Sequence, residues 1–273
     1  MIQKLLGTYS GENQHQKLYL EVSKEQFACW TVDEHDGKFQ NFELFQFKNA
    51  EDFTIEFKNL LAQSQFLQKY DANKKVIVIW DNENAQLIPA EFALEDQAWV
   101  QNLVTPFDAN LRQMSATTDD YSINFEMDKS ALDTLSTHFK EIKHRHKFDC
   151  ISKVLSKSVA KSGLNFHLLY FTEHCILSAV KDGKLQFIKR IQYQSPLDPV
   201  YFILNACEQF DTKIEDAQVN VAGLITYESP LYQSLIKYVP KIDVEEVTKN
   251  IFDAAQFTEQ PEHYYVPFLK YSI

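Results

Sequence analysis

The sequence predicts an α/β protein of two pseudo-symmetric domains, each a mixed sheet flanked by helices. Two observations carry this prediction: similar β-hairpin segments occur in both halves of the chain, and the same order of helices and strands follows each hairpin. The length agrees, because 273 residues suffice for two domains of ordinary size. The composition, with 45% hydrophobic and 24% charged residues, is that of a globular protein.

The two similar segments run from Leu18 to Phe47 and from Phe166 to Tyr193. Each begins with an apolar strand, turns through a polar corner that contains a glutamate, and continues into a second apolar strand. An Asp-Gly pair follows, which favours a tight hairpin because glycine readily adopts a positive φ. The corner residues Glu25 and Glu173 are 148 positions apart and the turn glycines 146, so the repeats differ by two residues within the hairpin.

The elements after each hairpin also match. In the first half, a helix within residues 49–70 precedes a buried strand over Lys75–Trp80. In the second half, a helix over Asp198–Phe210 precedes a buried strand over Ala217–Ile225, and a helix over Ser229–Val239 follows. Because helices connect successive parallel strands, this order predicts mixed sheets with helices on their faces.

A helical and polar region is expected between the repeats. One helix is predicted from an apolar stripe at helical spacing, formed by Leu132, Leu135, Phe139 and Ile142. Residues 151–161 are expected to form a second helix. The basic run Lys143–Lys147 lies between them and predicts a solvated loop, with a phosphate or an acidic partner as the alternative. We place the first domain at residues 1–160 and the second at 161–273.

Charge and glycine content exclude several classes of function. The 27 Lys+Arg against 38 Asp+Glu leave a net charge of -11, which repels nucleic-acid phosphates and anionic lipid. The six glycines are too scattered for a Walker loop or a dinucleotide fingerprint. No apolar run of about 18 residues and no signal peptide is recognisable, so we expect a cytoplasmic protein without membrane insertion. The four scattered cysteines are expected to be buried thiols.

No residue pattern predicts a catalytic residue or a metal site. His144 and His146 flank an arginine and lack a third ligand at suitable spacing. The carboxylate pairs Asp33-Glu34 and Asp119-Asp120 lie next to turns and are expected to be solvated. The standard hydrolase signatures are absent from the sequence.

The repeated layout resembles the actin-like ATPase superfamily, with its ribonuclease-H-like domains. The most specific match is Val219–Val239, where an apolar strand, the pair Ala222-Gly223, a polar turn and an amphipathic helix follow the order of the superfamily's adenosine motif. More narrowly, the chain resembles a bacterial domain-of-unknown-function family assigned to this fold. The resemblance implies a domain duplication whose two hairpin corners clasp nucleotide phosphates.

The corners depart from the pattern of nucleotide-binding members, which carry Asp-x-Gly-Thr/Ser at the first corner. Here Glu21 replaces the Asp and Ser23 the Gly, while the second corner has neither residue. The resemblance therefore implies a degenerate pseudo-ATPase. Residues that would still bind a nucleotide are Glu21, Ser23, Lys24, Thr172 and Gly223. We expect no cofactor, with ATP and Mg²⁺ as the alternative.

The C-terminal segment from His263 to Tyr271 is rich in aromatic residues. It either packs on its own core or is an exposed segment that binds a partner or a second subunit. The partner-binding candidates are Tyr264, Tyr265, Phe268 and Tyr271. The leading functional hypothesis is a non-catalytic scaffold that binds another protein or itself. An ATP-binding switch or a sugar-kinase-like phosphotransferase is the alternative, since fold alone does not decide function.

Overall fold

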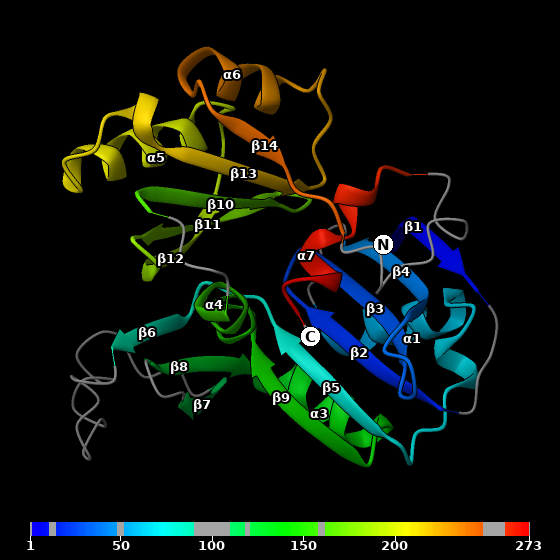
Figure 1. Ribbon diagram of the computed structural model, residues 1–273. Helices are drawn as coiled ribbons and strands as arrows, with labels where there is room; N and C mark the ends of the chain where they lie inside the picture. Colours follow the sequence, from blue (N-terminus) through cyan, green and yellow to red (C-terminus); the bar gives the residue numbers. More distant parts are fainter. Residues whose placement is uncertain are drawn as a thin grey trace. The chain divides into compact units, whose positions relative to one another are not determined.

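The computed structural model describes residues 2–10, 15–47, 52–89, 110–117, 121–157, 162–247 and 260–272. The chain divides into two compact units, Met1–Asp149 and Cys150–Ile273. Each unit has a mixed sheet and helices of its own, which confirms the predicted two-unit α/β architecture (Figure 1). The boundary predicted between residues 160 and 161 lies outside the described residues.

The first unit is built on a six-stranded sheet. Its strands in spatial order are β1 (Ile2–Tyr9), β4 (Phe39–Phe47), β3 (Gln26–Asp33), β2 (Gln16–Val22), β5 (Lys75–Trp80) and β9 (Glu141–His146). The first four are antiparallel neighbours, whereas β5 and β9 run parallel to β2. The predicted repeat includes neither β1 nor β9.

Two helices of the first unit contact each other, α1 (Phe53–Gln63) and α3 (Lys129–His138). Both begin at an aspartate whose side chain accepts a backbone hydrogen bond from the first turn, and such caps stabilise a helix start. The ring of Phe57 in α1 packs 6.0 Å from that of Phe27 in β3, so α1 covers a face of the sheet. A 3-10 turn, η1 (Leu67–Lys69), follows α1.

A small antiparallel sheet is inserted between β5 and α3. Its strands in order are β6 (Ala85–Pro89), β8 (Tyr121–Asp128) and β7 (Leu111–Thr117). The sequence did not predict it, because the outer strand β7 is largely exposed and polar and lacks the apolar alternation of a half-buried strand. The pair Asp119-Asp120 lies outside the described residues.

The structure corrects two expectations about the connecting region. The apolar stripe does not form one helix, because α3 ends before Phe139 and Ile142 lies on β9. The basic run is not a solvated loop: it forms the end of β9 and the start of α4 (Lys147–Lys157), with His146 and Lys147 fully buried. The run contains no apolar residue, so its sequence does not distinguish an edge strand from a solvated loop.

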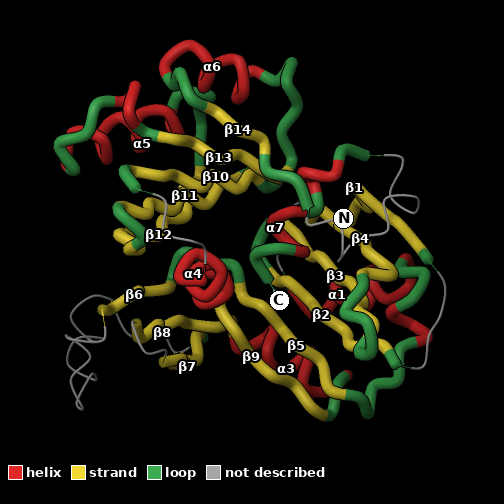
Figure 2. Tube along the Cα trace, viewed as in Figure 1, coloured by secondary structure: helices red, strands yellow, loops and turns green. Residues whose placement is uncertain are grey.

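The second unit has a five-stranded sheet with the same connectivity. Its strands in order are β12 (Lys184–Gln192), β11 (His174–Lys181), β10 (Leu164–Tyr170), β13 (Gln218–Gly223) and β14 (Ile242–Val244). The helices α5 (Asp198–Gln209) and α6 (Pro230–Tyr238) pack on one face of it and bury a hydrophobic core (Figure 2). Short helical turns complete the unit, at η3 (Ile214–Asp216), η5 (Glu262–Tyr264) and α7 (Val266–Leu269).

The two sheets repeat the same pairing residue by residue. At the first corner the N–H of Ser23 donates to the carbonyl of Gln26 at 3.0 Å, and at the second the N–H of Phe171 donates to that of His174 at 2.9 Å. These residues are 148 positions apart, as the sequence predicts. Both hairpins also shift register at the same place, after Thr31 and after Ala179.

All four cysteines are buried and free, as expected. No helix among the described residues is long and apolar enough to cross a membrane.

Gly223 is fixed by backbone geometry at the end of β13. Its φ is +94°, and a Cβ at this position would lie 2.0 Å from the carbonyl oxygen of Tyr170 in β10. Any side chain would therefore separate two strands that pair in parallel at this position. The glycine is explained by strand packing, whether or not a ligand binds beside it.

We expect Gly223→Ala to destabilise the second unit by clearly more than the ~1 kcal/mol that a positive φ alone costs an alanine. Gly37→Ala is the matched control, because Gly37 has φ +69° but nothing within 4 Å of a built Cβ. Urea unfolding followed by circular dichroism measures both. Equal losses of stability in the two variants would contradict the packing explanation.

Candidate functional site

The carboxyl ends of the parallel strands define one candidate site in each unit. In open α/β sheets, ligands bind at this edge. The edge is formed by β2, β5 and β9 in the first unit and by β10, β13 and β14 in the second. The predicted residues Glu21, Ser23 and Lys24 lie at the first edge, and Thr172 and Gly223 at the second.

A buried ion pair lies at the first edge. Glu21 is the penultimate residue of β2, and Lys147 begins α4 directly after β9. The Nζ atom of Lys147 donates to Oε2 of Glu21 at 2.6 Å, and the two side chains are 0% and 1% exposed. Burial of either charge alone would be strongly unfavourable, so each group requires the other. Sequence reasoning missed Lys147, because its partner lies 126 positions earlier in the chain.

Further charged and polar side chains are buried at the ends of β5 and β9. Asp81 follows β5 directly, and its N–H donates to the carbonyl of Val22 at 2.9 Å. Arg145 at the end of β9 donates from Nε to Oδ2 of Asp149 in α4 at 3.1 Å. The N–H of Phe148 donates to Nδ1 of His146 at 3.1 Å. Hydrogen bonds between neighbouring elements therefore hold this edge together.

Ser23 stabilises the first corner itself. Its Oγ accepts hydrogen bonds from the N–H groups of Glu25 at 3.2 Å and Gln26 at 3.0 Å. Such a local turn gives an acceptor to backbone N–H groups that would otherwise be available to bind a phosphate. Lys24 is exposed to solvent beside it.

The first edge does not fit a hydrated magnesium ion held by Glu21. The resemblance assigns that role to the corner carboxylate, but here an ammonium group already lies 2.6 Å from it. Like charges about 4 Å apart repel by about 4 kcal/mol near a protein surface, and a doubly charged ion would be repelled more. Within the described residues, no group of three His, Cys, Asp or Glu side chains is placed to hold a metal.

Aromatic side chains fill the second corner. The ring of Phe171 stacks on that of His174 at 4.7 Å, and the ring of Phe268 in α7 meets Phe171 edge-on at 5.8 Å. Phe171 is 1% exposed. The next residue, Thr172, is half-buried. An aromatic cluster therefore packs at the corner that the resemblance assigns to a phosphate contact.

The C-terminal segment covers this same edge of the second unit. Both η5 and α7 contact β13, and Nε2 of His263 lies 2.8 Å from the carbonyl oxygen of Ile225, just after that strand. Tyr265, Phe268 and Tyr271 are buried, and Tyr264 is half-buried. This placement supports the interpretation that the segment packs on its own core, and it leaves little of these side chains for a partner.

A carboxylate anchors the segment. Glu245 directly follows β14, and its Oε1 lies 2.7 Å from Nδ1 of His167 in β10. From the segment, Lys270 Nζ lies 2.6 Å from Oε2 and the hydroxyl of Tyr271 donates to the carboxylate at 3.0 Å. Burial raises the pKa of Glu245, but the hydrogen bonds and charges of His167 and Lys270 outweigh burial and lower it to about 2.

Replacing Lys147 by Met should destabilise the first unit by about 3–5 kcal/mol, because Glu21 then remains buried without its counter-charge. Adding Glu21→Gln to the same chain should recover most of this loss. Urea unfolding measures both. The exposed pair of Lys75 with Glu141, whose side chains are 50% and 62% exposed, provides the control Lys75→Met, for which we expect little change. A double variant as unstable as the single one would refute the coupling.

Acid should weaken the attachment of the C-terminal segment. Because the folded-state pKa of Glu245 is depressed, its ionisation stabilises the fold above the ordinary pKa of 4.5, and this contribution is lost as the pH falls from about 4.5 to about 2. The loss is at most about 3 kcal/mol. Melting temperatures over this range should fall more steeply for the wild-type chain than for Glu245→Gln, and parallel curves would contradict the assignment.

Comparisons with known proteins agree with this architecture. A crystal structure from Bacteroides thetaiotaomicron, described as a protein with actin-like ATPase fold and unknown function, superposes with a TM-score of 0.74 at 16% identity and covers 88% of this chain and 93% of that one. A chain of the PilM-PilN type IV pilus biogenesis complex superposes with a TM-score of 0.63 at 12% identity, covering 93% and 97%. These likenesses confirm the actin-like ATPase fold.

The profile of one sequence family, described as Protein of unknown function (DUF3822), matches residues 8–242. No curated protein matches the sequence.

Proposed function

The chain belongs to the DUF3822 family, and we propose that it is a non-catalytic scaffold of the actin-like ATPase fold that works by binding another protein. The observation that carries the proposal is the ion pair of Lys147 with Glu21. Phosphoryl transfer depends on a metal ion that neutralises phosphate charge. The carboxylate that would orient this ion is engaged by a lysine of the chain itself.

The second unit supports the same proposal. The adenosine motif of the resemblance lies at the end of β13, where His263 contacts the Ile225 carbonyl and α7 contacts the strand. A nucleotide would have to replace part of this segment, including buried aromatic side chains. Loss of so much buried apolar surface is strongly unfavourable, so we propose that no nucleotide cofactor is bound.

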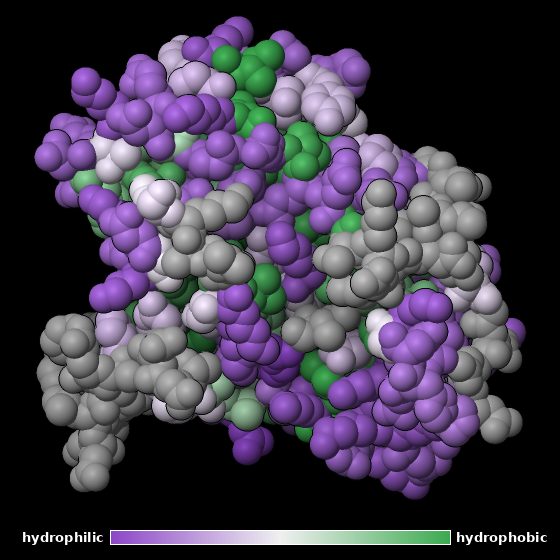
Figure 3. Space-filling view, viewed as in Figure 1, coloured by the Kyte–Doolittle hydropathy of each residue, from purple (hydrophilic) through white to green (hydrophobic). Residues whose placement is uncertain are grey.

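A protein partner is favoured over other ligand classes. A protein of this fold is present in the PilM-PilN complex, which supports a binding role for the architecture. The net charge of -11 disfavours nucleic acid and anionic membranes. Among the described residues on the face in Figure 3, hydrophobic side chains occur as small separate groups within a mainly hydrophilic surface. Association with another protein or with a second copy, in the cytoplasm, is therefore part of the proposal.

Titration calorimetry with ATP and Mg²⁺ tests the proposal. We expect no saturable heat, since neither corner offers a site for the phosphates. Binding tighter than about 10 μM, or about -7 kcal/mol, would overturn it in favour of an ATP-binding switch or a sugar-kinase-like phosphotransferase. The control variant carries Glu21→Gln together with Lys147→Met. A substitution at Gly223, such as Gly223→Val, is unsuitable as a control because it would disturb strand packing. Binding that disappears in this folded double variant would place the nucleotide at the first edge.

A further inference from the structure

The strand β1 is an addition to the repeat. The two sheets share five strands in equivalent order, and β1 extends the first by pairing antiparallel with the outer side of β4. The equivalent of β4 in the second unit is β12. The pairing shows this, because Glu43 lies opposite Cys29 and Lys189 lies opposite Leu177, the residue 148 positions after Cys29. Among the strands that the structure describes, none pairs with the outer side of β12.

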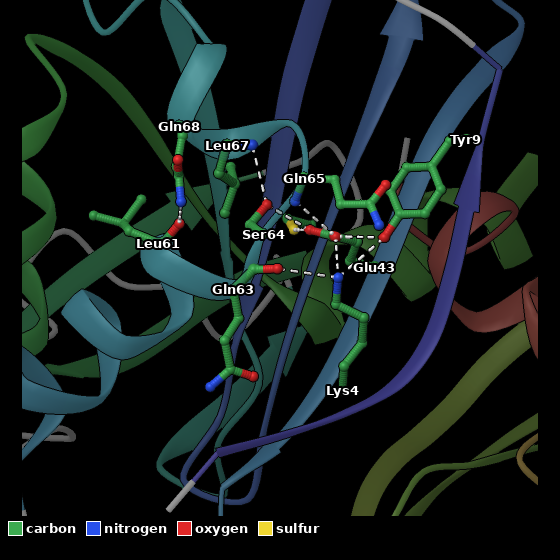
Figure 4. A network of polar contacts seen from close by, with 10 residues as sticks. Lys4, Tyr9, Glu43, Leu61, Gln63, Ser64, Gln65, Leu67 and Gln68 are labelled. Carbon is green, nitrogen blue, oxygen red and sulfur yellow. Dashed lines mark hydrogen bonds and ion pairs between the residues drawn. The ribbon is translucent and has the colours of Figure 1, made fainter.

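A buried carboxylate fastens β1 to β4. Figure 4 shows Glu43 of β4 between β1 and the end of α1. Its Oε1 accepts hydrogen bonds from Lys4 Nζ and from the Tyr9 hydroxyl, both at 2.6 Å and both from β1. Just after α1, the N–H of Gln65 also donates to Oε1, and the hydroxyl of Ser64 donates to Oε2. Glu43 is fully buried, so the incoming strand provides the charge that this carboxylate needs.

The equivalent position in the second unit carries the opposite charge. Lys189 in β12 corresponds to Glu43, and its Nζ lies 5.1 Å from the ring centre of Phe202 in α5. The helix α5 follows β12 as α1 follows β4. Lys189 therefore lies on the same face of the sheet as Glu43, but it is exposed. A strand beside β12 would meet a cation where β1 meets an anion.

The strand β12 as a whole is basic. Within Lys184–Gln192 there are three cations and no acidic residue, in a chain with a net charge of -11. An extended segment with carboxylates complements this edge, since opposite charges on neighbouring strands attract and like charges repel. Peptides commonly bind proteins by adding a strand to an exposed sheet edge.

We propose that the outer edge of β12 accepts an extended acidic segment of a partner protein. The segment pairs antiparallel with β12 as β1 pairs with β4. A carboxylate of the segment binds Lys189, and this pair is equivalent to that of Lys4 with Glu43 but has the charges exchanged. In this register the acidic residue lies opposite Ile191, the equivalent of Phe45, which faces Lys4. The inference rests on the proposed scaffold function and specifies the chemistry of the partner.

The test uses two fluorescein-labelled peptides, one with the sequence of Ile2–Tyr9 and one with Lys4→Glu in that sequence. Fluorescence anisotropy measures their binding to the full chain, and amide NMR shifts locate it. We expect the acidic peptide to bind about tenfold more tightly than the unchanged one. The shifted amides should be those of Phe187–Gln192, which are equivalent to the β4 residues that β1 covers.

Three variants make the expectation specific. Lys189→Glu should reverse the preference between the two peptides, and Lys189→Gln should remove it. Lys184→Glu is the matched control: it makes the same charge change on the same strand, but at a position beyond the register that β1 covers on β4, so it should keep the preference for the acidic peptide.

Several outcomes would overturn the proposal. No shift of β12 amides at about 1 mM peptide would exclude a useful site there. Equal binding of both peptides, or an equal effect of Lys184→Glu and Lys189→Glu, would exclude recognition by Lys189. Self-association of Lys189→Glu without peptide binding would show that the lysines protect an edge from aggregation. If ATP binds and the acidic peptide also binds at β12, only the scaffold function is overturned. If neither ATP nor the peptide binds, only the proposed peptide site at the β12 edge is overturned.

Discussion

The buried ion pair of Lys147 with Glu21 determines what the first sheet edge can do. Both groups are withdrawn from water, and neither can leave the other without a cost of several kcal/mol. The pair connects β2 to the start of α4, two elements that are distant in the chain. The charge of Glu21 is therefore neutralised within the chain, and its carboxylate stabilises the fold rather than being available to a ligand.

In the second unit, too, contacts within the chain occupy the sheet edge, but other residues make them. Its edge is covered by the C-terminal segment, and Glu245 receives donors from His167, Lys270 and Tyr271. The duplicated backbone is conserved down to the corner hydrogen bonds and the register shift in each hairpin. The corner side chains differ, in contrast, since Glu21 and Ser23 of the first corner correspond to Leu169 and Phe171 of the second. Duplication therefore preserved the sheet geometry while each edge acquired its own internal contacts.

The sequence could predict the repeat because hairpins are determined locally. An Asp-Gly turn with positive φ at both residues, as at Asp182 and Gly183, follows from a few neighbouring positions. The partner of Lys147 could not be predicted, because a run of basic residues ordinarily indicates a solvated surface and its burial here depends on distant Glu21. The C-terminal aromatic residues left two interpretations open, since only tertiary packing decides whether such side chains are buried.

A duplicated fold also provides an internal comparison for each surface. Where the backbone is the same, a difference between equivalent side chains reflects what lies beside them. Glu43 is buried because β1 covers it and supplies Lys4, whereas Lys189 at the same position is exposed. A buried carboxylate at Lys189's position would be intolerable without a covering strand, and an uncovered β4 would leave Glu43 and its neighbours open to water. The charge at this position thus depends on whether the chain itself supplies the adjoining strand. It supplies one beside β4 but none among the described strands beside β12, so the β12 edge is where a strand of another protein would pair.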